Sequence, residues 1–353
     1  MTNDQITVKD LDPRRLSPGE KAALNVFDNR MHQEQWPEDP PRSIEQTLGP
    51  WLFVPEYLDL HQRVAWAGGD REVAGRGYIH IGRYLENPHM ADFDIYVVPE
   101  MRLRGIAREL LREIAEVARR EDRQLLLVST DRAIPAGREF VWRLGAREGV
   151  DSHTNQLDLA DLNLPLVEEW CRRGRQKEGS FRLETWEGDY TPEQLEVMGE
   201  LKEVMNTAPT DSLELEEFKW SGEHLQQEDR VLAQRGITRW TMIVRHVASQ
   251  ELAGFTEVFW NPRRSGIAEQ GHTAVLPKYR RRGLAQWLKG EMLQKILAQR
   301  PEIRKIRSNV ADSNASMLRI NRQLGFRPYK TWTTWQIDLE RVLAYLGEVQ
   351  AEG

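Results

Sequence analysis

The sequence contains one cysteine, Cys171, among 353 residues. A single thiol excludes an internal disulfide and leaves too little sulfur for a zinc cluster, so we interpret Cys171 as incidental. No stretch approaches the ~20 consecutive apolar residues of a membrane-spanning helix. Residues 1–5 also lack the basic and then apolar pattern of a secretion signal. We therefore expect a cytoplasmic protein without a membrane partner.

The chain also has little excess charge of either sign. It carries 49 Lys and Arg against 55 Asp and Glu, a net charge of −6. This sign repels nucleic acid, so any anion-binding site must be local. The 40% hydrophobic and 29% charged residues are typical of globular domains rather than disordered or fibrous chains. A length of 353 residues is about twice that of one domain.

Hydrophobic periodicity predicts two similar α/β series, one before about residue 165 and one after about residue 178. The first series is expected to have strands at 6–8, 62–67, 73–81, 92–98 and 125–129, helices at 18–30, 105–120 and 137–144, and a final pair of strands. The second is expected to have strands at 181–185, 240–247, 251–259, 267–276, 305–310 and 332–337, and helices at 191–205, 283–297 and 315–324. We predict domains at 1–165 and 179–353, joined by a charged linker at 166–178.

One motif repeats in register. Val97–Ala107 reads VVPEMRLRGIA, and Val275–Ala285 reads VLPKYRRRGLA. Arg280 follows Arg102 by 178 residues, and a Leu-Gly pair ends 43 residues after Arg102 and 45 after Arg280. Two signatures that recur at nearly one spacing predict a duplicated domain.

The repeated motif has the features of an anion site. Gly105 and Gly283 permit a close approach of ligand to backbone at the start of a helix. The free N–H groups of that helix start, together with the positive end of the helix dipole, can hold a pyrophosphate. Lys278 and the run Arg280–Arg282 add positive charge in the second copy.

This motif resembles the acetyl-CoA motif of the GNAT superfamily of N-acetyltransferases, Gln/Arg-x-x-Gly-x-Gly/Ala at a strand-to-helix junction. The resemblance implies an α/β fold with a mixed sheet, arranged as two tandem GNAT domains, and acetyl-CoA as co-substrate. In that family the strand before the motif splays from its neighbour and pairs with pantetheine, and the following amides bind the pyrophosphate. The implied CoA-binding residues are Val98, Arg102, Leu103, Arg104, Gly105, Ile106 and Ala107, and in the second half Val275, Arg280, Arg281, Arg282, Gly283, Leu284 and Ala285.

A second family signature, Asn-x-x-Ala-x-x-Leu-Tyr-x-x-x-Gly-Phe, is echoed by residues 314–326, which implies that Asn314 contacts CoA. The first half has no equivalent asparagine in residues 133–137. We therefore expect the second domain to be catalytic and the first to be degenerate. This arrangement is similar to that of mycothiol synthase in architecture only, and the thiol-sugar substrate of that enzyme is not carried over.

Acetyl transfer to an amine requires a deprotonated nucleophile, a thioester held close to it and donors for the developing oxyanion. In the histone acetyltransferases of this superfamily the base is a glutamate eleven residues before the first motif position. That position is Glu269 in the second half and Ala91 in the first. Glu269 is our predicted base, with Glu257 and His272 as reserves. The alternative that these are ordinary solvated or hydrogen-bonded side chains stays open.

The expected general acid is missing. The tyrosine that often protonates the departing thiolate in this family falls at Asn321 in the second half and at Val141 in the first. Tyr279 and Tyr329 are the alternatives, and the sequence does not rank them.

The expected partners are acetyl-CoA and a small primary amine, bound by a monomer or a homodimer. The acidic segment 208–217 lies where GNAT folds wall the acceptor site, and it favours a cationic amine, although a solvated loop is the alternative. A non-catalytic acetyl-CoA sensor is the rival function, and the missing tyrosine favours it. Nucleic-acid binding through Lys278–Arg282 is a second rival, and the net negative charge argues against it.

Overall fold

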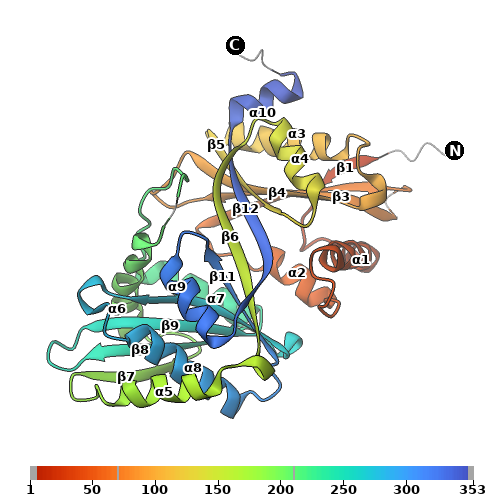
Figure 1. Ribbon diagram of the computed structural model, residues 1–353. Coiled ribbons are helices and arrows are strands. Elements are labelled where there is room, and N and C mark those ends of the chain that lie inside the picture. The colour runs from red at the N-terminus through yellow and green to blue at the C-terminus, as the bar shows by residue number, and fades with distance from the viewer. Residues whose placement is uncertain (1–5, 70, 210, 349–353) are drawn as a thin grey trace. The chain divides into compact units, whose positions relative to one another are not determined.

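The computed structural model describes residues 6–69, 71–209 and 211–348, which form two compact units (Figure 1). The first unit contains the described residues up to Val150, the short segment Ser212–Leu215 and the described residues from Trp332 onward. The second unit contains Asp151–Asp211 and Glu216–Thr331. No helix in the described part of the chain is both long and apolar enough to cross a membrane.

The first unit is a mixed sheet with helices on both faces (Figure 1). Its strand order is β1 (Thr7–Asp10), β2 (Leu58–Ala67), β3 (Glu72–Gly82), β4 (Met90–Val97), β5 (Leu125–Asp131) and β12 (Arg327–Asp338). β4 and β5 are parallel, and the other neighbours are antiparallel. Apolar residues of α1 (Pro18–Gln35) and α2 (Ile44–Leu52) pack on one face. The other face is covered by α3 (Ile106–Arg120), α4 (Pro135–Arg143) and α10 (Leu339–Leu346).

The second unit repeats this plan. Its strand order is β7 (Phe181–Glu187), β8 (Thr238–His246), β9 (Leu252–Trp260), β10 (Ile267–Val275), β11 (Lys305–Ala311) and β6 (Arg147–Asp158), with β10 and β11 parallel. One face packs against α5 (Leu164–Arg175), α8 (Leu284–Gln299) and α9 (Ala315–Leu324). The opposite face packs against α6 (Pro192–Lys202) and α7 (Gly222–Gln234).

The last strand of each unit comes from the other half of the sequence. β6 follows α4 in the chain but pairs with β11, and its Leu157 is fully buried in the core of the second unit. β12 follows α9 but pairs with β5 through Trp332–Asp338, and Trp335 and Ile337 are buried in the core of the first unit. The compact units therefore differ from the sequence repeats 1–165 and 179–353. The single long strand β6 also replaces the pair of strands expected before residue 165.

The segment 166–178, expected to be a linker, is mostly helix α5. Val167, Trp170 and Cys171 lie at helical spacing and are buried in the core that α5 shares with α8. Gly174 completes this face, because a Cβ there would stand 2.0 Å from the Trp287 ring. Charge dominated our reading of the segment, but apolar periodicity determines its structure.

Besides α5, three helices were not expected from periodicity: α2, α7 and α10. Both α2 and α7 begin with a capping box, formed by Ser43 with Gln46 and by Ser221 with His224, whereas α10 has no side-chain cap. The predicted start of α1 is confirmed, since Ser17 caps it in the same way with Glu20.

Candidate active site

The two repeated loops have the same backbone conformation. In the first unit, a 3₁₀ turn over Pro99–Met101 precedes left-handed geometry at Leu103 (φ 61°) and Gly105 (φ 83°), and α3 follows. In the second unit, Arg281 (φ 63°) and Gly283 (φ 74°) occupy the equivalent positions before α8. Left-handed geometry is unfavourable for leucine and arginine. Its recurrence at equivalent positions shows that the loop shape is a retained feature of both units.

The first arginine of each motif holds its loop in place. Arg102 donates from Nε to the Val97 carbonyl (3.1 Å) and from Nη2 to Glu34 on α1 (2.6 Å). Arg280 likewise donates from Nε to the Val275 carbonyl (3.0 Å) and from Nη2 to Thr207 (2.7 Å). These side chains tie the end of the strand to the loop and to the neighbouring helical layer. Both guanidinium groups therefore have a structural role in the described residues.

The remaining predicted CoA-binding residues divide into buried and outward-facing positions. Val98, Val275, Ile106 and Leu284 are buried in the core, so their side chains do not face a ligand. The side chain at position 103 is almost fully exposed (98%). Space around the loop is open as well, since a Cβ at Gly105 would have nothing within 4 Å. The site thus exposes the backbone amides of a helix start, as a pyrophosphate requires.

In each unit, the strand that leads into the loop parts from its parallel neighbour. The ladder of β4 with β5 covers Met90–Asp92, while β4 continues to Val97. The ladder of β10 with β11 covers Ile267–Gln270, while β10 continues to Val275. The edge beyond Asp92 or Gln270 turns backbone groups toward the space between the strands. A ligand that carries its own amide groups would pair there, and this feature, with the open loop, fits an acyl-CoA.

Asn314 lies at the start of α9, where it acts as the N-cap. Its Oδ1 accepts from the Met317 amide (3.2 Å) and from the Ser316 hydroxyl (3.1 Å). In the first unit, Ile134 stands before α4 and forms no side-chain cap. The asparagine therefore fixes the helix that follows the splayed strands in the second unit.

Of the three predicted catalytic residues, two lie next to each other and the third, Glu269, has a different partner. Glu269 is exposed on β10, where its Oε1 receives a hydrogen bond from Arg264 at 3.1 Å. Glu257 and His272 are instead brought together, with His272 Nδ1 lying 3.6 Å from Glu257 Oε2. The side chain of His272 is 44% exposed, whereas that of Glu257 is fully buried.

Glu257 is the centre of a buried polar network. Tyr190 donates its hydroxyl to Oε1 (3.0 Å), and Lys202 Nζ lies 3.4 Å from the same oxygen. Burial alone would raise the pKa of Glu257, but the Lys202 ammonium, His272 and Arg239 lower it to about 2. The carboxylate is therefore ionised at neutral pH. A buried carboxylate beside an imidazole orients the ring and stabilises its protonated form.

A β-bulge creates this pairing. Val258 faces Gln270 and Thr256 faces Thr273, so Gly271 and His272 together stand opposite Glu257. His272 also lies beyond Gln270, the last residue of β10 paired with β11. The imidazole is thus placed on the splayed part of the strand.

A different pair occupies the equivalent place in the first unit. Gly75 pairs with Val97 in the first unit as Gly254 pairs with Val275 in the second. Counting along the strands from these pairs, Tyr78 is equivalent to Glu257. Asp94 is equivalent to His272. Tyr78 donates its hydroxyl to Asp94 at 2.5 Å. Burial raises the pKa of Tyr78 well above its usual value, and burial raises that of Asp94 to about 6. The first unit therefore has no histidine base at this point.

Two buried polar residues were missed by our sequence reasoning. Lys289 on α8 is 2% exposed and donates to Gln270 Oε1 at 3.2 Å, and burial lowers its pKa to about 7. The signal was a lysine on the apolar stripe with Met292 and Ile296. Asn321, noted only as a replaced tyrosine, is 1% exposed, and neither amide atom has a hydrogen-bond partner in the described part of the chain.

Tyr279, one of the two alternatives for the general acid, already has a hydrogen-bond partner. Its hydroxyl donates to Glu251 Oε2 at 2.8 Å, and the residue is 7% exposed.

These features define an α/β protein in which each unit has the same open loop at a helix start, and in which the second unit places a histidine–carboxylate pair on the strand before that loop. The model of the acetyltransferase (GNAT) family matches residues 26–138 and 203–326, so the chain belongs to that family, and the predicted tandem fold is confirmed. This fold supports acyl-CoA-dependent N-acyl transfer. No curated protein matches the sequence.

Solved structures share the fold at low sequence identity. A tandem GNAT protein from the clavulanic acid biosynthesis pathway, determined without acetyl-CoA, has a TM-score of 0.74 at 22% identity, with 95% of this chain and 99% of that chain covered. A GCN5-related N-acetyltransferase from Sphaerobacter thermophilus has a TM-score of 0.64 at 16% identity, covering 95% and 96% of the two chains. Both likenesses extend over the whole tandem arrangement.

Proposed function

We propose that the second unit transfers an acetyl group from acetyl-CoA to a primary amine, with His272 as general base and Glu257 as the residue that positions it. The observation that carries this proposal is the buried Glu257 held against a half-exposed imidazole on the splayed part of β10. We place Glu269, the base expected from the sequence, outside the proton-transfer step because its carboxylate is ion-paired with Arg264 on the surface.

The chemistry follows from the tautomer of His272. If Nδ1–H points at Glu257, Nε2 accepts a proton from the ammonium form of the acceptor and leaves the free amine. The amine nitrogen then forms a bond to the thioester carbonyl carbon, and the carbon–sulfur bond breaks with the electron pair on sulfur. The proton that the nitrogen loses as the amide forms is taken up by the thiolate, which leaves as the free CoA thiol. The negative charge of Glu257 stabilises the imidazolium formed in the first step. The exposed amides of the loop Arg280–Ala285 would hold the pyrophosphate of the acyl donor.

The acceptor is the least constrained part of the proposal. The segment 208–217 was expected to wall the acceptor site of the second domain. Its central part, Ser212–Leu215, belongs instead to the first unit, where Leu213 packs against Met90, Leu125 and Leu127. The neighbouring Trp220 remains in the second unit, with its ring centroid 6.4 Å from His272 and 4.9 Å from Lys202 Nζ. The aromatic ring of Trp220, with the acidic Glu216 and Glu217 shortly before it in the chain, supports a cationic amine. The cytoplasmic location also stays a prediction.

The test measures release of free CoA thiol from acetyl-CoA with a panel of primary amines, including polyamines and aminoglycosides. His272→Gln should lower kcat by about 10²–10⁴-fold, the usual contribution of a general base. Glu269→Gln is the matched control on the same strand and should retain activity within a few-fold.

Two results would reverse these assignments. Full turnover by His272→Gln together with loss of turnover by Glu269→Gln would return the base to Glu269. Binding of acetyl-CoA without thiol release from any amine would favour the non-catalytic sensor.

A further inference from the structure

The first unit contains a partly open cavity of about 240 Å³ that the proposed reaction does not use. It lies between helices α1 and α2 and the face of the sheet formed by β2, β3 and β4. Phe27, Met31 and Trp51 supply apolar walls, and Asp28, Arg42 and Arg76 supply charge. This volume is smaller than a drug-sized pocket and suits a small metabolite.

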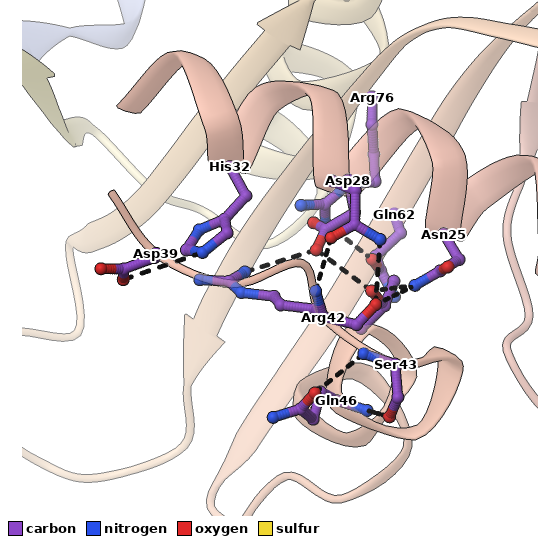
Figure 2. Close-up of polar contacts among 11 residues, drawn as sticks. Asn25, Asp28, His32, Asp39, Arg42, Ser43, Gln46, Gln62 and Arg76 are labelled. Atoms are coloured by element: carbon purple, nitrogen blue, oxygen red, sulfur yellow. Dashed lines mark hydrogen bonds and ion pairs between the residues drawn. The ribbon is translucent and has the colours of Figure 1, made fainter. Parts of the chain in front are cut away.

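Arg76 is the central group of the cavity. Its side chain extends from β3 toward Asp28 of α1 (Figure 2), and the residue is only 6% exposed. Its guanidinium carbon lies 4.4 Å from the centroid of the Trp51 ring and 5.1 Å from that of Tyr78. Nη1 donates to Gln62 Oε1 at 3.2 Å, but Nε has no hydrogen-bond partner in the described residues. A buried guanidinium with an unused donor is costly unless a ligand completes it.

The carboxylates near Arg76 have other donors. Asp28 Oδ2 receives Arg42 Nη1 (3.3 Å) and the Thr47 hydroxyl (3.2 Å), as Figure 2 shows for Arg42. Asp94 receives the Tyr78 hydroxyl at 2.5 Å. Arg42 is itself fixed to α1, because its backbone amide donates to Asn29 Oδ1 at 2.6 Å. The polar groups around the cavity are thus built into the fold, and Arg76 retains a free donor.

The fold does not itself require this cation. In the second unit, the position equivalent to Arg76 is Phe255, which is fully buried in an apolar cluster. The same sheet face is therefore stable with a phenyl ring in place of a guanidinium. A charge retained at such cost in one unit only points to a ligand of opposite charge.

We propose that the cavity of the first unit binds a small organic carboxylate, with the carboxylate on Arg76 and an apolar body against Phe27, Met31 and Trp51. The planar guanidinium matches a carboxylate in a way that a point charge does not. The proposal concerns only the first unit and is independent of the function proposed for the second.

The experiment titrates the full chain with three probes of equal length, hexanoate, hexanamide and hexylamine, by calorimetry and by the shift in Tm. Hexanoate should bind at least about tenfold more tightly than hexanamide. Any shift that hexylamine causes should be the same in the wild-type chain and in Arg76→Gln, because a primary amine is expected only in the second unit. Arg76→Gln should weaken hexanoate binding by at least about tenfold, and Arg76→Lys should weaken it by a smaller factor. Arg143→Gln, an exposed change on α4 of the same unit, should leave the affinity unchanged.

Three results would contradict binding of a carboxylate to Arg76. Equal affinity for hexanoate and hexanamide, or no binding of hexanoate to the wild-type chain, would overturn the proposal. Unchanged hexanoate affinity in Arg76→Gln would also overturn it. If Arg76→Gln does not fold, Arg76→Lys and Met31→Trp, which fills the cavity while keeping Arg76, take its place. His272→Gln should retain full hexanoate affinity, and a loss there would place the carboxylate in the second unit.

Discussion

The two units share one backbone plan but differ in where they bury charge. Both have the splayed strands and the left-handed loop, with Leu103 and Arg281 in equivalent conformations. The second unit buries a histidine-facing carboxylate, Glu257, and a lysine, Lys289, where the first has Tyr78 and Leu111. The first unit instead buries Arg76 against Trp51. Because the loop is common to both, these buried charges are what distinguish a proposed catalytic unit from a proposed ligand-binding unit.

Each unit takes its last strand, β12 or β6, from the other half of the sequence, and this exchange of strands should give the largest measurable effect. Trp335→Ala in the C-terminal half should destabilise the first unit by about 3–5 kcal/mol, because Trp335 is 2% exposed and donates to Thr130 Oγ1 at 2.8 Å. Leu157→Ala in the N-terminal half should destabilise the second unit by about 2–5 kcal/mol. Hydrogen exchange measured by mass spectrometry should show each effect in the opposite half of the sequence.

The readout for this test is the protection of β3 and β4 for the first unit and of β8 and β9 for the second. Val26→Ala, at a residue 69% exposed, serves as the control and should change neither. Loss of protection confined to the half that carries the substitution would show that the exchange is absent in solution.

Lys289 tests the difference in buried charge. Its folded pKa of about 7 lies below the value of about 10.4 in an unfolded chain, so the unfolded state binds more protons between these values. The free energy of unfolding should therefore rise with pH, by about 2 kcal/mol from pH 7 to 8.5 from this group. Lys289→Leu, which installs the residue found at Leu111, should remove this contribution and raise stability at pH 7.

Urea unfolding at a series of pH values measures how steeply the free energy of unfolding changes with pH. The range stops at pH 8.5 because burial raises the pKa of the Cys171 thiol to about 12, and this group lowers stability at higher pH. Lys219→Leu, at an exposed lysine of the same unit, should leave the slope intact. A slope unchanged in Lys289→Leu would mean that the lysine is solvated in the folded state.

The loops were predictable from sequence because their structure is local. Gly105 and Gly283 permit the left-handed turn, and the spacing of the motif places it between a strand and a helix. The exchange of β6 and β12 was not predictable in this way, since β6 has few apolar residues that could indicate its partner and the pairing strands are far apart in sequence.

The site was predicted only in part. Glu257 and His272 were named singly, but their pairing depends on the bulge between Gln270 and Thr273. Gly271, in the interior of the strand, was the available signal for this bulge. The burial of Arg76 was invisible, because it depends on Trp51 from a helix that periodicity did not indicate.

The smallest expected effect is a difference in affinity between the loops. Leu103 and Arg281 have nearly the same φ, 61° and 63°, so exchanging them changes charge with little change in backbone. Arg281→Leu should weaken CoA binding by the second unit a few-fold, about 1 kcal/mol, and reduce its salt dependence, because an exposed arginine interacts with phosphate through screened charge. Leu103→Arg should strengthen binding by the first unit by a similar factor.

Titration of each variant with CoA at two salt concentrations measures both changes, with Arg143→Leu as the control for lost surface charge. If neither exchange alters affinity, the loops do not contact the phosphates and the shared left-handed geometry serves folding alone.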